Sequence, residues 1–225
     1  MELTTKQLEE VDRYISCCGI KYYDVRAEIV DHFASVLEQR LEENPTLDFK
    51  KEIVNIHKNF SENGFYNLLK DKTESVHKKF YVSSLKHLLS FFKLPKIIIS
   101  IALFLGLNEI LKITKDKNNF FFILSVIGIL IMFQMLIRVS IKREKKTVSF
   151  LVLNKSDSFM QLINFLFITY NSSINFRSKI SLENELHNQI HLGIYILIIL
   201  FYFSGEYVFR QNKKMVLEQY PNILV

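Results

Sequence analysis

Tryptophan is absent from this sequence of 225 residues, and cysteine, proline and glycine are scarce, with two, three and six residues. The two cysteines, Cys17 and Cys18, are adjacent and do not make a disulfide framework of the kind that small secreted domains use. So few chain breakers favour long helices over turn-rich sheets. We therefore expect an all-α protein whose thiols face a reducing compartment.

Recognisable catalytic motifs are also missing. The chain has no Gly-rich phosphate loop, no Gly-flanked serine nucleophile and no His-Glu-x-x-His motif. Glu28 and His32 can share a helical face, but no further ligands follow at a spacing typical of a metal site. We predict no metal, no cofactor and no enzymatic activity. A membrane-embedded enzyme would need a catalytic constellation that these residues do not offer.

Positive and negative charges are unevenly distributed along the chain, so that its parts differ in the sign of their net charge. The net charge is −5 over residues 1–50, +5 over 51–96 and +6 over the remainder. A nucleic-acid-binding protein would need a basic patch away from the membrane, and the first fifty residues are acidic, so we predict no direct nucleic-acid partner. The polar Met1–Glu10 segment is not a cleavable signal peptide, so the N-terminal part should stay where it is made.

Apolar residues are abundant, at 49% of the chain with 20 phenylalanines. Four long apolar segments approach the roughly 20 residues that cross a bilayer. The third is the weakest, because Asn154–Asp157 interrupts its pattern and several Asn and Gln follow. We expect it to begin after a Ser156 or Asp157 cap and to cross, with a re-entrant or interfacial helix as the alternative. The four predicted spans are 96–113, 120–140, 158–176 and 189–209.

Basic residues set the expected orientation of these spans. They are concentrated before the first span, in the loop 138–146 and after Arg210, whereas loops 114–119 and 171–188 carry only two Lys or Arg each. With four crossings, every strongly basic segment falls on one side. We therefore predict a multi-pass protein of the bacterial inner membrane with both termini in the cytoplasm.

The first 93 residues read as a water-soluble helical domain. Thr4 and Gln7 have capping-box spacing, and Gly19 provides a left-handed residue to end that helix. A second helix should begin near Asp24, whose carboxylate can cap it, and end at about Glu43. Asp48 or Thr46 should cap a third helix, and a break at 62–64 should precede a long helix over 65–93. We therefore divide the chain into a domain 1–93, a transmembrane domain 94–213 and a tail 214–225.

Two charged rows stand out on these helices. The acidic row has spacings of 3, 4 and 7 residues on the second helix, and it reads as a solvated face, a docking surface for a basic protein partner or a partner of the domain's own basic half. The basic row recurs every seventh residue on the fourth helix, where it suits a membrane surface or an ordinary charged face. The acidic row is Asp24, Glu28, Asp31, Glu38 and Glu42, and the basic row is Lys72, Lys79, Lys86 and Lys93.

Polar residues inside spans are costly and usually face the interior of a bundle. Glu109 and His191 should lie at similar depth, so a contact between them is geometrically possible. Glu206 should share a level with Arg138 and Arg210, while Gln134 and Asn164 are deeper and can join helices by hydrogen bonds. Because the charges cluster at the ends of spans, helix pairing is favoured over a transport path.

The segment Ile20–His32, followed by Glu38, and the later Phe91–Lys96 entry into the first span resemble uncharacterised multi-pass membrane proteins of Bacteroidetes-type bacteria. That resemblance carries no activity. More distantly, Glu28, Ile29, Asp31 and His32 resemble the HAAS-type signalling domain of Gram-positive membrane proteins, although the turn after the third helix differs from the family pattern. This second resemblance implies a cytoplasmic tether or sensor for a PadR-like transcriptional regulator.

From the sequence we expect a cytoplasmic N-terminal helical domain followed by a four-helix transmembrane bundle. Its predicted role is non-catalytic, as a membrane-tethered interaction or signalling module that presents the acidic row to a protein partner. A homo-oligomer is compatible with this role. The alternative is a small transporter or an accessory subunit of an inner-membrane complex, in which Glu109, His191 and Glu206 line a polar route.

Overall fold

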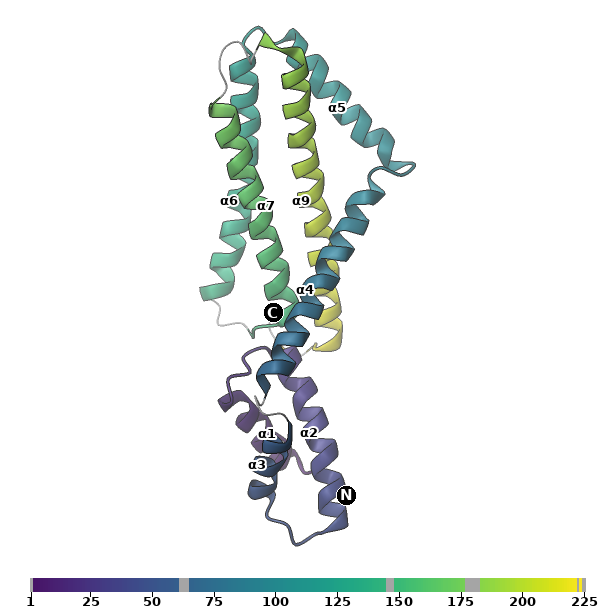
Figure 1. The fold of residues 1–225 in the computed structure, drawn as a ribbon, viewed down its shortest axis with the longest axis vertical. Helices are drawn as coiled ribbons and strands as arrows, with labels where there is room; N and C mark the ends of the chain where they lie inside the picture. The colour runs from purple at the N-terminus through teal and green to yellow at the C-terminus, as the bar shows by residue number, and fades with distance from the viewer. Residues whose placement is uncertain (1, 61–64, 145–147, 177–182, 222, 224–225) are drawn as a thin grey trace. The chain divides into compact units, whose positions relative to one another are not determined.

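The computed structural model describes residues 2–60, 65–144, 148–176, 183–221 and 223, which form eight helices and no strand (Figure 1). The predicted break at 62–64 lies outside the described residues. The chain divides into two compact units. An N-terminal unit comprises Met1–Lys78 with Val148–Lys155, and a bundle unit comprises Lys79–Thr147 with Ser156–Pro221.

The N-terminal unit contains α1 (Thr5–Cys17), α2 (Tyr23–Glu43) and α3 (Phe49–Phe60), together with the beginnings of α4 (Phe65–Ser90) and α7 (Leu151–Asn175). The predicted Thr4–Gln7 capping box is present in full. Gly19 has the expected positive φ of 92°. Asp48 accepts hydrogen bonds from the backbone of Lys50 and Lys51 and so caps α3. These local predictions are confirmed because each cap lies within a few residues of its helix.

The core of the N-terminal unit is built from one apolar stripe of each helix. The stripe predicted on α2 is buried at Val25, Ile29, Phe33, Leu37 and Leu41. It packs with Val11, Ile15, Ile53, Ile56 and Phe65 of the neighbouring helices. Leu151, at the start of α7, is fully buried in the same core although it follows α4 by sixty residues.

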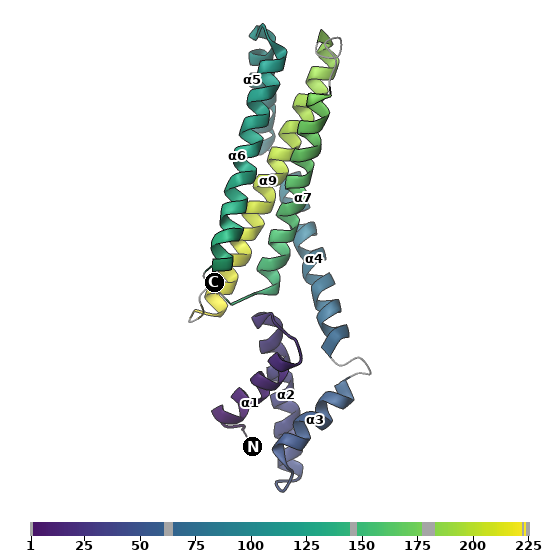
Figure 2. The same cartoon turned by 90° about the vertical axis from the view of Figure 1, so that its left-hand side faces the viewer.

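The bundle unit contains the second part of α4 with α5 (Lys96–Ile113), α6 (Lys117–Glu144), most of α7 and α9 (Glu185–Gln219). Figures 1 and 2 show α6, α7 and α9 running alongside one another. Glycines permit the closest approaches. A Cβ at Gly128 of α6 would lie 3.1 Å from the Phe167 ring of α7, and one at Gly205 of α9 would lie 2.7 Å from the Phe159 ring.

The boundary between the units lies within α4, after Lys78, rather than near residue 93. The reason is packing. Phe80 is buried in the core of the bundle unit, where its ring lies 5.1 Å from that of Phe159. Leu88 and Phe91 pack against the same core. The second part of α4 therefore belongs with the helices that follow it.

Two helices, α6 and α9, are long and apolar enough to cross a membrane among the residues described. Helix α5 spans the 18 residues that were expected but contains Lys96, Glu109 and Lys112. Helix α7 begins at Leu151, seven residues before the expected start, so that Asn154–Asp157 lies inside it. The prediction that Ser156 or Asp157 begins this helix is wrong.

Candidate functional site

The first member of the acidic row, Asp24, holds the beginning of a distant helix. Its carboxylate accepts hydrogen bonds from the backbone N–H groups of Leu151 at 2.9 Å and Val152 at 3.3 Å, which are the free amides of the first turn of α7. The Tyr23 N–H also donates to the Ser149 carbonyl at 2.8 Å. A negative charge at a helix N-terminus is favourable. Asp24 also accepts the Val25 backbone N–H at 3.1 Å in the first turn of its own helix, as the sequence predicted, although Tyr22, the residue before α2, makes no side-chain cap bond.

Two further members of the row have partners within the N-terminal unit. The Glu28 carboxylate lies 2.5 Å from the Lys72 ammonium, and Lys72 is the first residue of the basic row. Glu38 accepts the Leu3 backbone N–H at 2.9 Å and so fixes the chain just before α1. The intramolecular role that the sequence left open is therefore found at these positions. Glu42 lies exposed near the end of α2.

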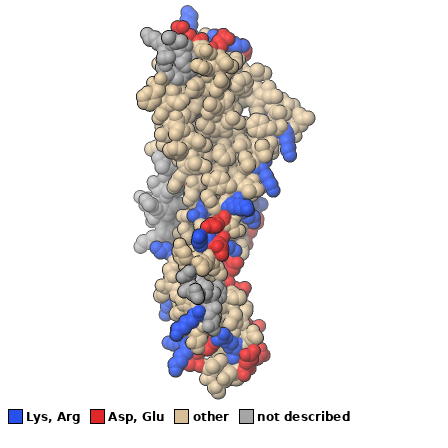
Figure 3. All heavy atoms as spheres, viewed as in Figure 1, with Lys and Arg blue, Asp and Glu red and all other residues tan. Residues whose placement is uncertain are grey.

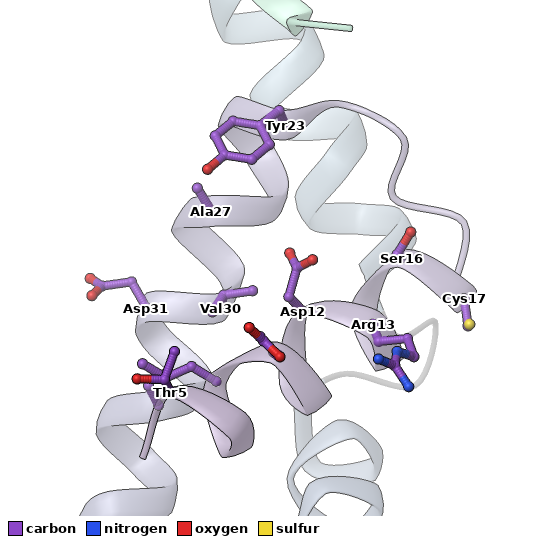
Figure 4. A pocket seen from close by; sticks show the side chains of 12 residues that line it. Thr5, Asp12, Arg13, Ser16, Cys17, Tyr23, Ala27, Val30 and Asp31 are labelled. Carbon is purple, nitrogen blue, oxygen red and sulfur yellow. The ribbon is translucent and has the colours of Figure 1, made fainter. Parts of the chain in front are cut away.

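Asp31 differs from the other members of the row. It is exposed, and among the residues described its carboxylate has no hydrogen bond or ion pair. It lies at the rim of a groove of about 720 Å³ between α1 and α2. In Figure 4, Val30 points toward α1 while Asp31 points away from it on the outer side of α2. The structure thus leaves Asp31 accessible beside an open groove.

The groove combines an apolar floor with negative charge. Leu8 of α1 and Ala27, Val30 and Ala34 of α2 supply the apolar surface. The remaining lining includes three carboxylates and one guanidinium; the lining residues are Thr5, Glu9, Asp12, Arg13, Ser16, Cys17, Tyr23 and Asp31.

One of the groove carboxylates is already neutralised. Asp12 pairs with the Arg26 Nε at 2.7 Å, while Glu9 and Asp31 remain exposed. An amphipathic helix that carries Lys or Arg beside its apolar face is complementary to such a surface.

A ring cluster fixes α3 beside α1. The Tyr14 hydroxyl lies 2.8 Å from His57 Nδ1, Cys18 Sγ lies 4.0 Å from the same nitrogen, and the His57 ring stacks on Phe65. Burial, together with the neighbouring Cys17, raises the pKa of the Cys18 thiol, which disfavours the thiolate that nucleophilic chemistry requires. No group of three His, Cys, Asp or Glu capable of holding a metal occurs in the described ranges. The contacts of this cluster join α1 to α3 and to the first residue of α4.

The polar residues expected inside the spans lie in different surroundings. Glu109 is exposed and pairs with Lys112 at 2.7 Å, so the suggested contact with His191 is not made. His191 instead packs near the rings of Phe121 and Tyr170.

The other three polar residues predicted inside the spans are Glu206, Asn164 and Gln134. Glu206 is largely buried and pairs with Arg210 at 3.0 Å, while the Arg138 side chain lies outside the described part. Asn164 is buried on α7, where a hydrogen-bonding role was expected, but Gln134 lies exposed on α6. The role of Gln134 in joining helices therefore stays a prediction.

Comparison of the chain with protein-family models, with curated proteins and with solved structures finds no match. The resemblances drawn from short motifs therefore remain predictions, and a function has to be argued from the residues themselves.

Proposed function

We propose that this protein is a membrane-anchored docking module, in which the bundle unit spans the bilayer and the N-terminal unit binds a cytoplasmic protein in the α1–α2 groove. The observation that carries the proposal is the distribution of exposed apolar side chains. Among the described residues, 35 large apolar side chains are exposed, and 32 of them belong to the bundle unit.

Such a surface fits lipid better than water. Soluble monomers rarely expose contiguous apolar patches larger than a few hundred Å². On the face drawn in Figure 3, the charged side chains of the bundle unit lie at its ends and along the edge formed by α4. Its buried residues include Ser84, Asn108, Ser156, Asn164, Asn188 and Ser204. Polar groups inside and apolar groups outside are typical of helices packed in a membrane.

The four-span arrangement rests on length, packing and loop charge. Helices α6 and α9 are each long and apolar enough to span the bilayer. With α5 and α7 they would make a bundle of four spans in which every strongly basic segment lies on the same side of the membrane. The charged residues of α5 lie near its ends, where long side chains reach the headgroups. This arrangement places both termini in the cytoplasm of a bacterial cell, with the protein in the inner membrane.

The natural cysteines test that topology, since Cys17 and Cys18 are both exposed in the N-terminal unit. A membrane-impermeant maleimide should leave them unlabelled in intact spheroplasts and label them after lysis. In a Cys17→Ser, Cys18→Ser background, Lys115→Cys in the α5–α6 loop should be labelled in intact spheroplasts. Labelling of Cys17 and Cys18 from outside would overturn the orientation.

The groove supports docking of a basic amphipathic helix from a protein partner. The apolar floor would hold the apolar face of that helix, and Asp31 and Glu9 would pair with its Lys or Arg residues. No catalytic step is required for this role. The distant resemblance to the HAAS-type domain makes a transcriptional regulator the partner class to examine first.

The docking test uses the full-length protein, because residues 148–155 complete the N-terminal unit and a fragment 1–93 lacks them. A photo-crosslinking amino acid at Ala34 should give a discrete adduct in cells, and one at Tyr66, exposed elsewhere on this unit, should not. Asp31→Lys should reduce the Ala34 adduct at least fivefold, while Asp71→Lys, at an exposed residue outside the groove, should leave it unchanged. An adduct indifferent to Asp31→Lys would count against the groove.

The transporter or accessory-subunit alternative requires Glu109, His191 and Glu206 to line one route. Glu109 is exposed on α5 and paired on its own helix, and this gives that alternative no support.

A further inference from the structure

The second part of α4 exposes an apolar stripe that the bundle does not cover. One face of this segment packs inward, with Phe80 and Ser84 buried. The adjoining face carries Val82, Leu85 and Leu89, which are 42%, 52% and 51% exposed, and Phe92, in the turn just after the helix, is 45% exposed. In water this face would be expected to carry polar residues, because α4 is long enough to bury its apolar side chains on a single stripe.

Exposed lysines border that stripe. Lys79, Lys86 and Lys93 recur every seventh residue, and residues three apart are neighbours on a helix surface, so Lys79 adjoins Val82 and Lys86 adjoins Leu89. None of these three lysines forms an ion pair within the described part of the chain. Figure 3 shows Lys and Arg side chains gathered along α4. The segment therefore presents an apolar stripe with an unneutralised basic edge.

The stripe continues onto the outer surface of the bundle. Leu94 is exposed between α4 and α5, and Ile98 and Ile99 are exposed at the start of α5. Lys96 turns back toward α4, where its ammonium donates to the Ser90 hydroxyl at 3.1 Å and lies 5.2 Å from the centre of the Phe91 ring. The apolar face of α4 and the apolar face of α5 thus meet at one basic junction.

We infer that the exposed face of residues 79–93, which comprise the second part of α4 and the turn that follows it, lies in the headgroup region of the membrane and binds anionic phospholipid. The inference rests on the proposed membrane span of the bundle. The stripe enters the boundary between headgroups and acyl chains, and the lysine ammonium groups pair with phosphodiester oxygens of acidic lipids. Continuity with α5 selects lipid over an acidic protein, since α5 continues the same apolar surface into the hydrocarbon.

The test places an environment-sensitive fluorophore at Leu89→Cys in a Cys17→Ser, Cys18→Ser background, with the full chain in phosphatidylcholine nanodiscs. One arm contains phosphatidylglycerol that carries a nitroxide on its acyl chain, and the other contains phosphatidylcholine labelled in the same way at the same fraction. We expect both lipids to quench the fluorophore and labelled phosphatidylglycerol to quench it more strongly. Soluble glycerol phosphate should not reduce this preference, which separates a lipid site from a free-phosphate site.

Charge reversal tests the lysines. Lys86→Glu with Lys93→Glu should abolish the preference for phosphatidylglycerol, lowering the relative affinity about tenfold, because each lysine at the surface contributes on the order of a few-fold. The control pair Lys58→Glu with Lys70→Glu, exposed in the N-terminal unit, makes the same change in net charge and should preserve the preference. Equal quenching by both lipids in the parent protein would overturn the anionic specificity.

A second probe separates this inference from the proposed function. A fluorophore at Leu130→Cys, exposed near the middle of α6, should be quenched by either labelled lipid. If labelled lipid quenches the fluorophore at residue 130 while only aqueous iodide quenches the one at residue 89, the inference about α4 is overturned and the proposed membrane span of the bundle stands. If iodide quenches the fluorophore at both positions, the inference about α4 and the proposed membrane span are both overturned. An acidic protein that protects residue 89 in cells, with no lipid quenching in nanodiscs, would also overturn it.

Discussion

The N-terminal unit and the bundle unit are both helical, but they distribute apolar and polar side chains in opposite ways. In the N-terminal unit, three large apolar residues are exposed among those described, Val54, Tyr66 and Val148, and carboxylates on its surface pair with Lys or Arg. In the bundle unit the exposed surface is largely Ile, Leu, Phe and Val, and Ser and Asn lie inside. Both units are helical, so the side chains on the outer surface are what distinguish them.

The largest effect is expected when a charge is introduced on the surface of each unit. Leu130→Arg on α6 should disfavour membrane insertion of that helix by about 3 kcal/mol, the cost of Arg near the middle of a span. Val54→Arg, at another exposed apolar residue, should change the free energy of unfolding by less than about 0.5 kcal/mol. Insertion of Lys117–Glu144 as a guest helix in a reporter protein measures the first effect, and thermal unfolding measures the second. Unchanged insertion of the Leu130→Arg helix would indicate that this surface faces water.

The second test concerns the interior of the bundle. Gly205→Leu should destabilise the bundle unit by about 1–3 kcal/mol, because a side chain there meets the buried Phe159 and Met160 at less than contact distance. Gly106→Leu is the matched control, since nothing lies within 4 Å of a Cβ placed there. Thermal unfolding in detergent reports both changes. Equal melting temperatures for the two variants would contradict the packing of α9 on α7.

A third test addresses the ion pair between the buried Glu52 and the half-buried Arg40 of the N-terminal unit. Glu52 is buried, and the hydrogen-bonded Arg40 guanidinium lowers the pKa of its carboxyl group below the usual value. Because the folded-state pKa is depressed, the stabilisation is present at neutral pH and is lost as the pH falls through the folded-state pKa.

Glu52→Gln should therefore lower the free energy of unfolding by about 1–3 kcal/mol at pH 7, and the difference from the parent should vanish in acid. Circular dichroism during thermal unfolding at a series of pH values measures this. Asp71→Asn, at an exposed residue, should have little effect at any pH. A difference that persists below the folded-state pKa would exclude the ion pair as its cause.

The smallest expected effect distinguishes the two candidate caps of α7. Asp24→Ala should cost about 1 kcal/mol and speed hydrogen–deuterium exchange of the amides of Leu151 and Val152. Asp157→Ala, which removes the carboxylate that sequence reasoning favoured, should leave those two amides protected because Asp157 lies inside the helix. The opposite pattern would restore the local cap.

Local signals in the sequence predicted much of the N-terminal unit. The Thr4–Gln7 box, the left-handed Gly19 and the α2 stripe each depend on residues within a turn or two of one another. The start of α7 was missed because its cap comes from Asp24, 127 positions earlier in the chain. No periodicity near Leu151 indicates such a partner.

The acidic row shows the same limit at the candidate site. Its helical spacing was visible, but spacing does not reveal that Asp24, Glu28 and Glu38 have partners within the unit while Asp31 has none among the described residues. Which carboxylate remains free depends on the packing of α1, α4 and α7 against α2. The apolar runs predicted four helices near the right positions, but among the described residues α6 and α9 alone are long and apolar enough to cross a membrane.

The burial of Leu151 beside Val11, Phe33 and Phe65 has a consequence for synthesis of the chain. A ribosome makes α1 to α4 first, then α5 and α6, and only afterwards the residues that complete the core of the N-terminal unit. Closing this core joins segments far apart in the chain, a topology that slows folding. The N-terminal unit should therefore mature after α5 and α6 have left the ribosome, which couples completion of its core to the biogenesis of these two helices.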